Sequence, residues 1–234
     1  MWLSSATNLL SAIEEVLGYF GLQNLPLSVF DVWRMISRSA NYQDVWKELA
    51  LGVDRGSIIR EGGWYTLPET RGAFDERRER LPSSLAKLRR ARRVSAYLKC
   101  LPYVRAVFLC NSLGVLNATA AADIDFFIVV RAGSIWRARF FSTAPFMLLG
   151  LRPRADSIRD RFCFSFFLSE EALDLRSLAL AGGDPYLAFW TLTLLPLNDP
   201  DEVYQKLFIQ SGLEKQFPQV VFPKTYELGE RHHF

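Results

Sequence analysis

The sequence predicts an α+β protein in which three short helices and a β-hairpin precede a mixed β-sheet core flanked by helices. Near the N-terminus, apolar residues recur at the i, i+3, i+4, i+7 spacing of amphipathic helices. A Gly-Gly turn then joins two β-rich runs, which is a strong hairpin signal. Further along, residues 106–110 and 124–130 form short apolar runs rich in β-branched and aromatic residues, as is typical of buried strands.

The composition allows a well-filled core. Half of the 234 residues are hydrophobic, which is enough for one large or two small domains. The net charge of +3 indicates no particular partner. Cys100, Cys110 and Cys163 form no C-x-x-C pair, so we expect buried thiols in a reducing compartment. The histidines are confined to positions 232 and 233, which disfavours histidine-based catalysis or a histidine-ligated zinc.

The chain shows no membrane or secretion signal at the sequence level. Its first residues, MWLSSATNLL, contain neither a basic leader nor a long apolar stretch. The most apolar segment, residues 140–151, is too short to span a bilayer. We therefore expect a cytoplasmic protein that does not associate with membranes.

In the N-terminal part, the spacing of apolar residues and the positions of turn residues predict three helices and a hairpin. Residues 5–20 predict one helix, a second begins after Pro26, and residues 42–53 predict a third. Residues 57–67 predict a β-hairpin whose turn is Glu61-Gly62-Gly63. This is the element order of a winged helix, so residues 1–69 are expected to form a winged-helix-like domain.

Winged helices often bind DNA through their third helix. Here the third helix carries Asp44, Lys47 and Glu48, and thus no basic excess to meet phosphate. We expect its Trp46 to lie in the core rather than contact a base. A structural or protein-interaction role is therefore favoured over a winged-helix DNA-binding protein.

Residues 70–101 predict a basic linker helix, interrupted at Pro82. Its basic residues between 87 and 99 are Lys87, Arg89, Arg90, Arg92, Arg93 and Lys99. One interpretation is a connecting helix with a solvated face. The other is an electrostatic patch that guides a nucleotide or a nucleic acid toward a site.

The stretch VFLCNSLGVLNATAAADIDFFIVV, residues 107–130, contains the candidate site. Asp123 and Asp125 flank Ile124 at the start of the second strand, and the two-residue period of a strand turns both carboxylates to one face. Ser112, just past the first strand, can direct its hydroxyl to the same spot. Two such carboxylates suit Mg²⁺, which proteins usually hold together with substrate phosphates.

These residues resemble the signature of the DNA polymerase β-like nucleotidyltransferase superfamily. That signature is a strand ending in Gly-Ser, a short spacer, and Asp-x-Asp entering the next strand. Asn111-Ser112 stands for Gly-Ser, and Asp123-Ile124-Asp125 for the acidic motif. The glycine is replaced, but asparagine enters the left-handed backbone region more readily than most residues.

The resemblance implies Mg²⁺-dependent transfer of a nucleoside monophosphate from an NTP to an acceptor, which is an RNA, a protein or a small molecule. Asp123 and Asp125 would be the catalytic, metal-binding residues, and Asn111 and Ser112 would bind substrate phosphates. The order of a winged helix, a basic helix and this core is similar to a group of bacterial nucleotidyltransferase-domain proteins of unassigned substrate.

Further candidates follow the second strand. Ser134 is a suitable N-cap for a helix from Ile135 to about residue 149, and its Arg137 is a candidate for binding the triphosphate. Arg139 in the same helix is an alternative for that role.

Residues 161–169 predict a third buried strand, which in the superfamily commonly supplies a third carboxylate. Strict alternation places two sets of side chains on opposite faces: Cys163, Ser165 and Phe167 on one, and Phe162, Phe164 and Phe166 on the other. Neither set contains an acid, although Asp160 precedes the strand and Glu170 and Glu171 follow it.

Two carboxylates hold one Mg²⁺ readily but two metals poorly. A catalytically inactive nucleotide-binding or protein-interaction module of the same fold is therefore the alternative to an enzyme. We expect the nucleotidyltransferase-like core to span residues 102–182. Residues 183–234 are expected to form a helical C-terminal segment, with Asp199 and Pro200 starting its second helix.

Overall fold

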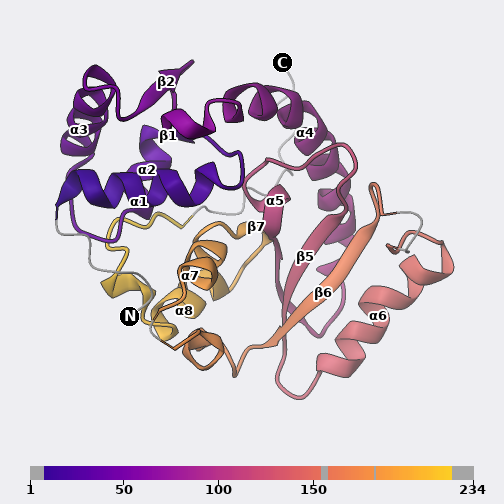
Figure 1. Ribbon diagram of the computed structural model, residues 1–234. Helices are drawn as coiled ribbons and strands as arrows, with labels where there is room; N and C mark the ends of the chain where they lie inside the picture. The colour runs from indigo at the N-terminus through magenta and orange to yellow at the C-terminus, as the bar shows by residue number, and fades with distance from the viewer. Residues whose placement is uncertain (1–7, 154–157, 182, 223–234) are drawn as a thin grey trace, which may run out of the picture.

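The computed structural model describes residues 8–153, 158–181 and 183–222, which form an α+β fold with two separate sheets (Figure 1). The predicted helix start at residue 5 and the histidines at 232 and 233 lie outside the described residues. The N-terminal unit contains α1 (Leu9–Gly21), β1 (Leu27–Ser28), α2 (Val29–Met35), α3 (Tyr42–Asp54), β2 (Ile59–Glu61) and β3 (Trp64–Thr66). Its strands form a small antiparallel sheet in the order β1-β3-β2.

Local sequence explains these boundaries. Ser28 and Asp31 form a reciprocal capping box at the start of α2, in which each side chain satisfies a backbone N–H of the other. Gly62 and Gly63, with φ of 56° and 84°, make the turn between β2 and β3. Because both backbones lie in the left-handed region, glycine is favoured at both positions.

The second sheet is mixed, as expected from the sequence, with strand order β6-β5-β4-β7. β4 (Val104–Leu109) runs antiparallel to β5 (Ile124–Val130), and β5 runs parallel to β6 (Phe162–Ser169). The remaining α-helices are α4 (Ala73–Leu98), α5 (Asn111–Gly114), α6 (Ile135–Leu148), α7 (Pro185–Leu192) and α8 (Val203–Gln210). Short 3-10 helices occupy 68–70, 175–178 and 213–215.

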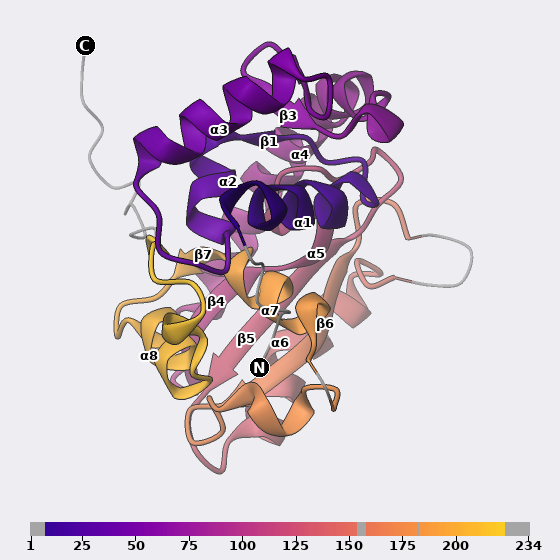
Figure 2. The same ribbon diagram turned by 60° about the vertical axis from the view of Figure 1, so that its left-hand side comes forward.

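Each face of this sheet buries its own hydrophobic cluster. Phe108 and Phe127 face α7 and α8, whereas Val107 and Phe126 face α4 and α6. The N-terminal unit joins the first cluster through α1, whose Phe20 ring lies 5.3 Å from that of Phe189 in α7. Figures 1 and 2 show α6 on the opposite side of the sheet from α7 and α8.

The C-terminal segment is not purely helical, which corrects the sequence prediction. Residues Leu195–Asn198 form β7, an edge strand antiparallel to β4. Pro196 is tolerated there because one side of an edge strand needs no ladder hydrogen bonds. Helix α8 begins at Val203 with Glu202 at its N-cap, so the prediction that Asp199 and Pro200 start this helix is wrong by three residues. Asp199 still accepts hydrogen bonds from the backbone N–H groups of Val203 and Tyr204, at 2.7 and 3.1 Å.

Strand β6 also departs from strict alternation. Asp125 pairs with Cys163, but Phe127 pairs with Phe166, so β6 advances by one extra residue between these pairs. This bulge turns Phe166 toward Trp190 on the face opposite Phe162 and Phe164, with 5.6 Å between the Phe166 and Trp190 ring centroids. The side chain of Ser165 lies outside the described part.

Helix α4 is continuous through Pro82, so the predicted interruption is wrong. Proline removes one backbone donor, but tertiary packing determines most helical stability in proteins. Two residues after Pro82, the buried Ser84 side chain donates to the carbonyl of Ala118 and accepts from its N–H. This contact fixes α4 against the loop before β5.

Lys87 is buried, with only 2% of its surface exposed, and does not belong to a solvated basic face as predicted. Its ammonium group donates to the carbonyls of Ala120 and Ala122, at 3.2 and 2.8 Å, and to the Asp160 carboxylate at 2.6 Å. Between residues 87 and 99, the exposed basic residues are Arg89, Arg92, Arg93 and, just beyond the end of the helix, Lys99.

Two further expectations about burial are wrong. Trp46 on α3 is 50% exposed and is not a core residue. Cys100 is exposed just after α4, whereas Cys110 is buried and Cys163 half-buried. Among the described residues, no helix is both long and apolar enough to cross a membrane.

Replacing Lys87 tests the buried ammonium. Lys87→Met should lower the free energy of unfolding by roughly 3 kcal/mol, because the Asp160 carboxylate and two carbonyls lose their buried donor. Arg92→Met, on the exposed face of the same helix, should change it by less than about 0.5 kcal/mol. Urea unfolding measures both, and equal stabilities of the two variants would contradict this role for Lys87.

Candidate metal centre

The turn after β4 has the backbone conformation that the sequence analysis anticipated. Asn111 adopts φ of 55°, in the left-handed region, and begins α5. Its Nδ2 donates to Oδ2 of Asp125 at 3.0 Å, and its Oδ1 accepts from Nε1 of Trp190 at 3.0 Å. Asn111 therefore links the Asp125 carboxylate to α7.

Gly114 lets this turn pack closely against the C-terminal segment. A Cβ atom at this position would lie 2.7 Å from the carbonyl oxygen of Thr193 and 3.2 Å from that of Leu109. Both are backbone atoms that cannot rotate away. Only glycine fits here, which holds α5 in place beside the end of α7.

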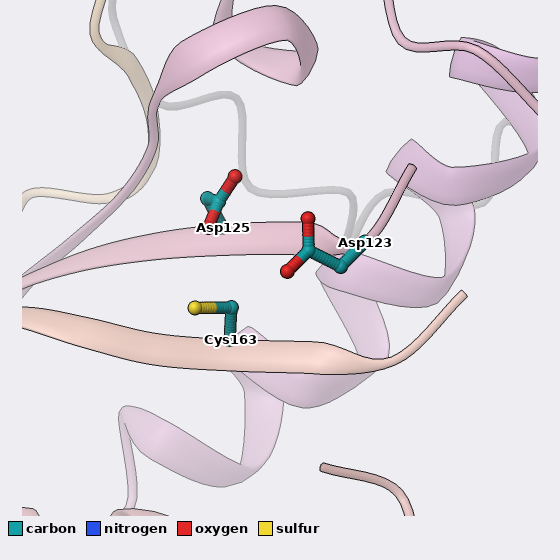
Figure 3. Close-up of side chains that lie close together, drawn as sticks. All are labelled: Asp123, Asp125 and Cys163. Atoms are coloured by element: carbon teal, nitrogen blue, oxygen red, sulfur yellow. The ribbon is translucent and has the colours of Figure 1, made fainter. Parts of the chain in front are cut away.

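The two predicted carboxylates lie together, and a thiol joins them. Asp123, Asp125 and Cys163 each offer one ligand atom, and these atoms all lie within 4.8 Å of one another. Asp125 and Cys163 are paired across the neighbouring strands β5 and β6, and Asp123 precedes β5 by one residue. Figure 3 shows the three side chains gathered on one side of these strands. All three are half-buried.

Burial and like charge act together on Asp123. Desolvation and the neighbouring Asp125 raise the pKa of the Asp123 carboxyl above its usual value. A backbone hydrogen bond and the charges of Lys87 and Arg152 partly offset this increase. Burial also raises the pKa of the nearby Cys110 thiol, with further contributions from Asp125, Cys163 and Asp123. The centre therefore has excess negative charge that a bound cation can neutralise.

The carboxylates considered for a third ligand are engaged elsewhere. Asp160 contacts Lys87 at 2.6 Å and Arg90 at 3.1 Å. Burial would raise the pKa of Asp160, but the hydrogen bond and charge of Lys87, together with Arg90, lower it below its usual value. Glu170 pairs with Arg105 at 2.8 Å and accepts from the N–H of Ala132 at 3.1 Å, beyond the far end of β6.

Arg137 does not lie beside the two acids. It occupies the first turn of α6, after the end of β5, whereas Asp123 and Asp125 lie at the start of that strand. Its guanidinium lies 4.9 Å from the centroid of the Tyr103 ring and donates to Ser134. Arg139 in turn lies over Phe167 at 5.7 Å.

A cavity of about 360 Å³ begins at the Asn111 turn. Asn111 and Ser112 form part of its wall, and the Ser112 residue is exposed. Aromatic side chains from three regions form much of the remainder: Tyr19, Phe20, Phe166, Tyr186, Phe189 and Trp190. Because Asn111 also donates a hydrogen bond to Asp125, it connects the acid pair to the cavity. The N-terminal unit contributes to the wall through α1.

Cys163 and Trp190 are the site residues that the sequence analysis missed. Alternation along the strand predicts the face on which Cys163 lies, but it does not predict which residues of other strands lie beside it. Its parallel pairing with Asp125 is a property of the sheet, not of local sequence. Trp190 lies in a Leu- and Phe-rich stretch, and nothing in that stretch distinguishes it from a core residue.

No protein-family model, curated protein sequence or solved structure matches this chain. The functional conclusion therefore depends on the geometry of the site and on its chemistry.

The raised pKa of Asp123 predicts a specific pH dependence. The folded protein binds the Asp123 proton more tightly than the unfolded chain, so wild-type stability falls as pH rises from the ordinary aspartate pKa of 3.8 through the raised pKa of Asp123. Asp123→Asn lacks this titration. In chelator-treated protein, its stability relative to wild type should therefore increase from about pH 4 to about pH 7. Urea unfolding at both pH values measures the difference, and a constant or shrinking difference would show that the carboxyl is not destabilised.

Proposed function

We propose that this protein is a nucleotidyltransferase of the DNA polymerase β-like type, which transfers a nucleoside monophosphate from an NTP to an acceptor hydroxyl. The observation that carries the proposal is the convergence of Asp123 and Asp125 beside the Asn111-Ser112 turn. The two residues of that turn in addition line a cavity of about 360 Å³, within the size range of ligand pockets. The mixed sheet with β5 parallel to β6 is compatible with this fold.

The donor set at the acid pair suits a divalent cation. Asp123 and Asp125 would hold Mg²⁺ through carboxylate oxygens, as hard cations prefer. When bound, the cation would neutralise charge on the phosphate oxygens. Asn111 holds Asp125 in position for this task through its 3.0 Å hydrogen bond.

Different parts of the cavity wall suit the phosphates and the base of a nucleotide. The exposed Ser112 residue, adjacent to Asn111, is the group we assign to the phosphates. The aromatic wall formed by Tyr19, Tyr186 and Trp190 offers stacking surfaces for a base. In the reaction, the acceptor oxygen bonds to the α-phosphorus while the bond from that phosphorus to the bridging oxygen breaks. Pyrophosphate leaves with the bonding electrons, and the hydroxyl proton passes to water.

We further propose that residues 9–66 are a winged helix that supports the site and does not read DNA. Its α1 provides Tyr19 and Phe20 to the cavity wall, and the turn after α1 provides Gln23. Its α3 has no excess of basic residues to meet phosphate. If the acceptor is a nucleic acid, the exposed basic residues on α4 are the groups we expect it to meet: Arg89, Arg92 and Arg93.

Calorimetry tests the binding part of the proposal. Wild-type protein should bind ATP or GTP in the presence of Mg²⁺, and Asp125→Asn should weaken this binding by at least about tenfold, because one of two cation ligands is lost. Asp54→Asn, an exposed position at the end of α3, is the matched control and should bind like wild type. Equal affinities for wild type and Asp125→Asn would contradict the assignment.

Pyrophosphate release distinguishes the enzyme from an inactive module. With RNA, protein and small-molecule acceptors supplied in turn, the proposed enzyme releases pyrophosphate and labels one of them. Metal-dependent NTP binding without release for any acceptor would favour a nucleotide-binding module. Among the described residues, the metal group contains two carboxylates and a thiol but no third carboxylate, which would explain such a result. A salt-dependent duplex DNA complex that survives loss of both aspartates would instead favour a DNA-binding protein.

A further inference from the structure

The candidate metal centre contains a sulfur ligand where a purely carboxylate site would contain a third oxygen. Cys163 places its Sγ within 4.8 Å of one oxygen from each aspartate, and it comes from the strand that pairs directly with Asp125. Its position is therefore fixed by the sheet, not by a mobile loop. Mg²⁺ is a poor partner for sulfur, because it prefers octahedral oxygen ligands.

We propose that the cation held by Asp123, Asp125 and Cys163 is a thiolate-accepting metal, Zn²⁺, in preference to Mg²⁺. The inference rests on the proposed function and changes the identity of the cation that serves it. Zinc binds cysteine thiolate together with carboxylate oxygens. Three protein ligands with a fourth position left to water or substrate is the arrangement of catalytic zinc sites.

The geometry is compatible with such a centre. Ligand atoms in a tetrahedral zinc site lie about 3.5 Å from one another. Atoms already within 4.8 Å of one another need only small side-chain rotations to reach that spacing. The hydrogen bond from Asn111 to Asp125 supplies the outer-shell support that orients a ligating carboxylate. The fourth position is the one we assign to a phosphate oxygen of the nucleotide.

Zinc binding would convert the Cys163 thiol to a thiolate and release its proton to the buffer, so uptake of metal and release of protons are linked. The other cysteines give a natural comparison. Cys100 is exposed and remote in sequence from both strands, so it offers a matched control for non-specific metal binding.

Cobalt titration provides a direct test, because Co²⁺ substitutes for Zn²⁺ and a cobalt–thiolate bond gives an intense near-ultraviolet charge-transfer band. Reduced full-length protein is titrated with Co²⁺ and then with Zn²⁺, and the experiment is repeated on Cys163→Ser and Cys100→Ser. Wild type and Cys100→Ser should show the band and lose it when Zn²⁺ displaces Co²⁺. Cys163→Ser should lack the band and bind Zn²⁺ more weakly. Loss of an outer-shell partner costs roughly 10- to 100-fold in metal affinity, and loss of a direct ligand should cost at least as much.

Cys163→Asp supplies the reciprocal variant. It should bind Mg²⁺ more tightly than wild type and show no thiolate band, because its third ligand is now an oxygen. If wild type binds Co²⁺ without the band and Cys163→Ser binds Zn²⁺ equally well, the thiolate proposal is overturned while the acid pair and the proposed function stand. If wild-type protein binds no divalent cation even with NTP present, both the zinc inference and the proposed function are overturned.

Discussion

Two carboxylates of like charge are held side by side at the start of β5, and the surrounding structure supplies what keeps them there. Partial burial, together with repulsion from Asp125, raises the pKa of Asp123. Such an arrangement costs stability in the absence of a cation, as is common where a protein positions groups for binding. The buried ammonium of Lys87 holds the loop before Asp123, and the Asn111 amide holds Asp125.

Sheet topology connects this pair to the rest of the molecule. The antiparallel pairing of β4 with β5 places the turn after β4 next to the start of β5, so Asn111 meets Asp125. The parallel pairing of β5 with β6 places Cys163 opposite the same aspartate. Helices α1 and α7 then enclose the adjoining cavity with aromatic side chains. The centre therefore combines ligand atoms from two strands with a cavity wall built by two distant parts of the chain.

Local sequence predicted the features that depend on local physics. Strand periodicity placed Asp123 and Asp125 on one face, and the tolerance of asparagine for positive φ anticipated the turn at Asn111. Features that depend on tertiary contacts were not predicted from the sequence. Lys87 has the charge of a surface residue and is buried because three acceptors surround it. The edge strand β7 contains a proline within a leucine-rich run that has no strand periodicity.

A crystal structure with Mn²⁺ and a non-hydrolysable NTP tests the central claim most directly, because manganese is located by its anomalous scattering. We predict an anomalous peak coordinated by both Asp123 and Asp125, with the triphosphate reaching Ser112 and the base inside the aromatic cavity. An ordered triphosphate bound elsewhere, or two aspartates that turn away from the metal, would contradict the account.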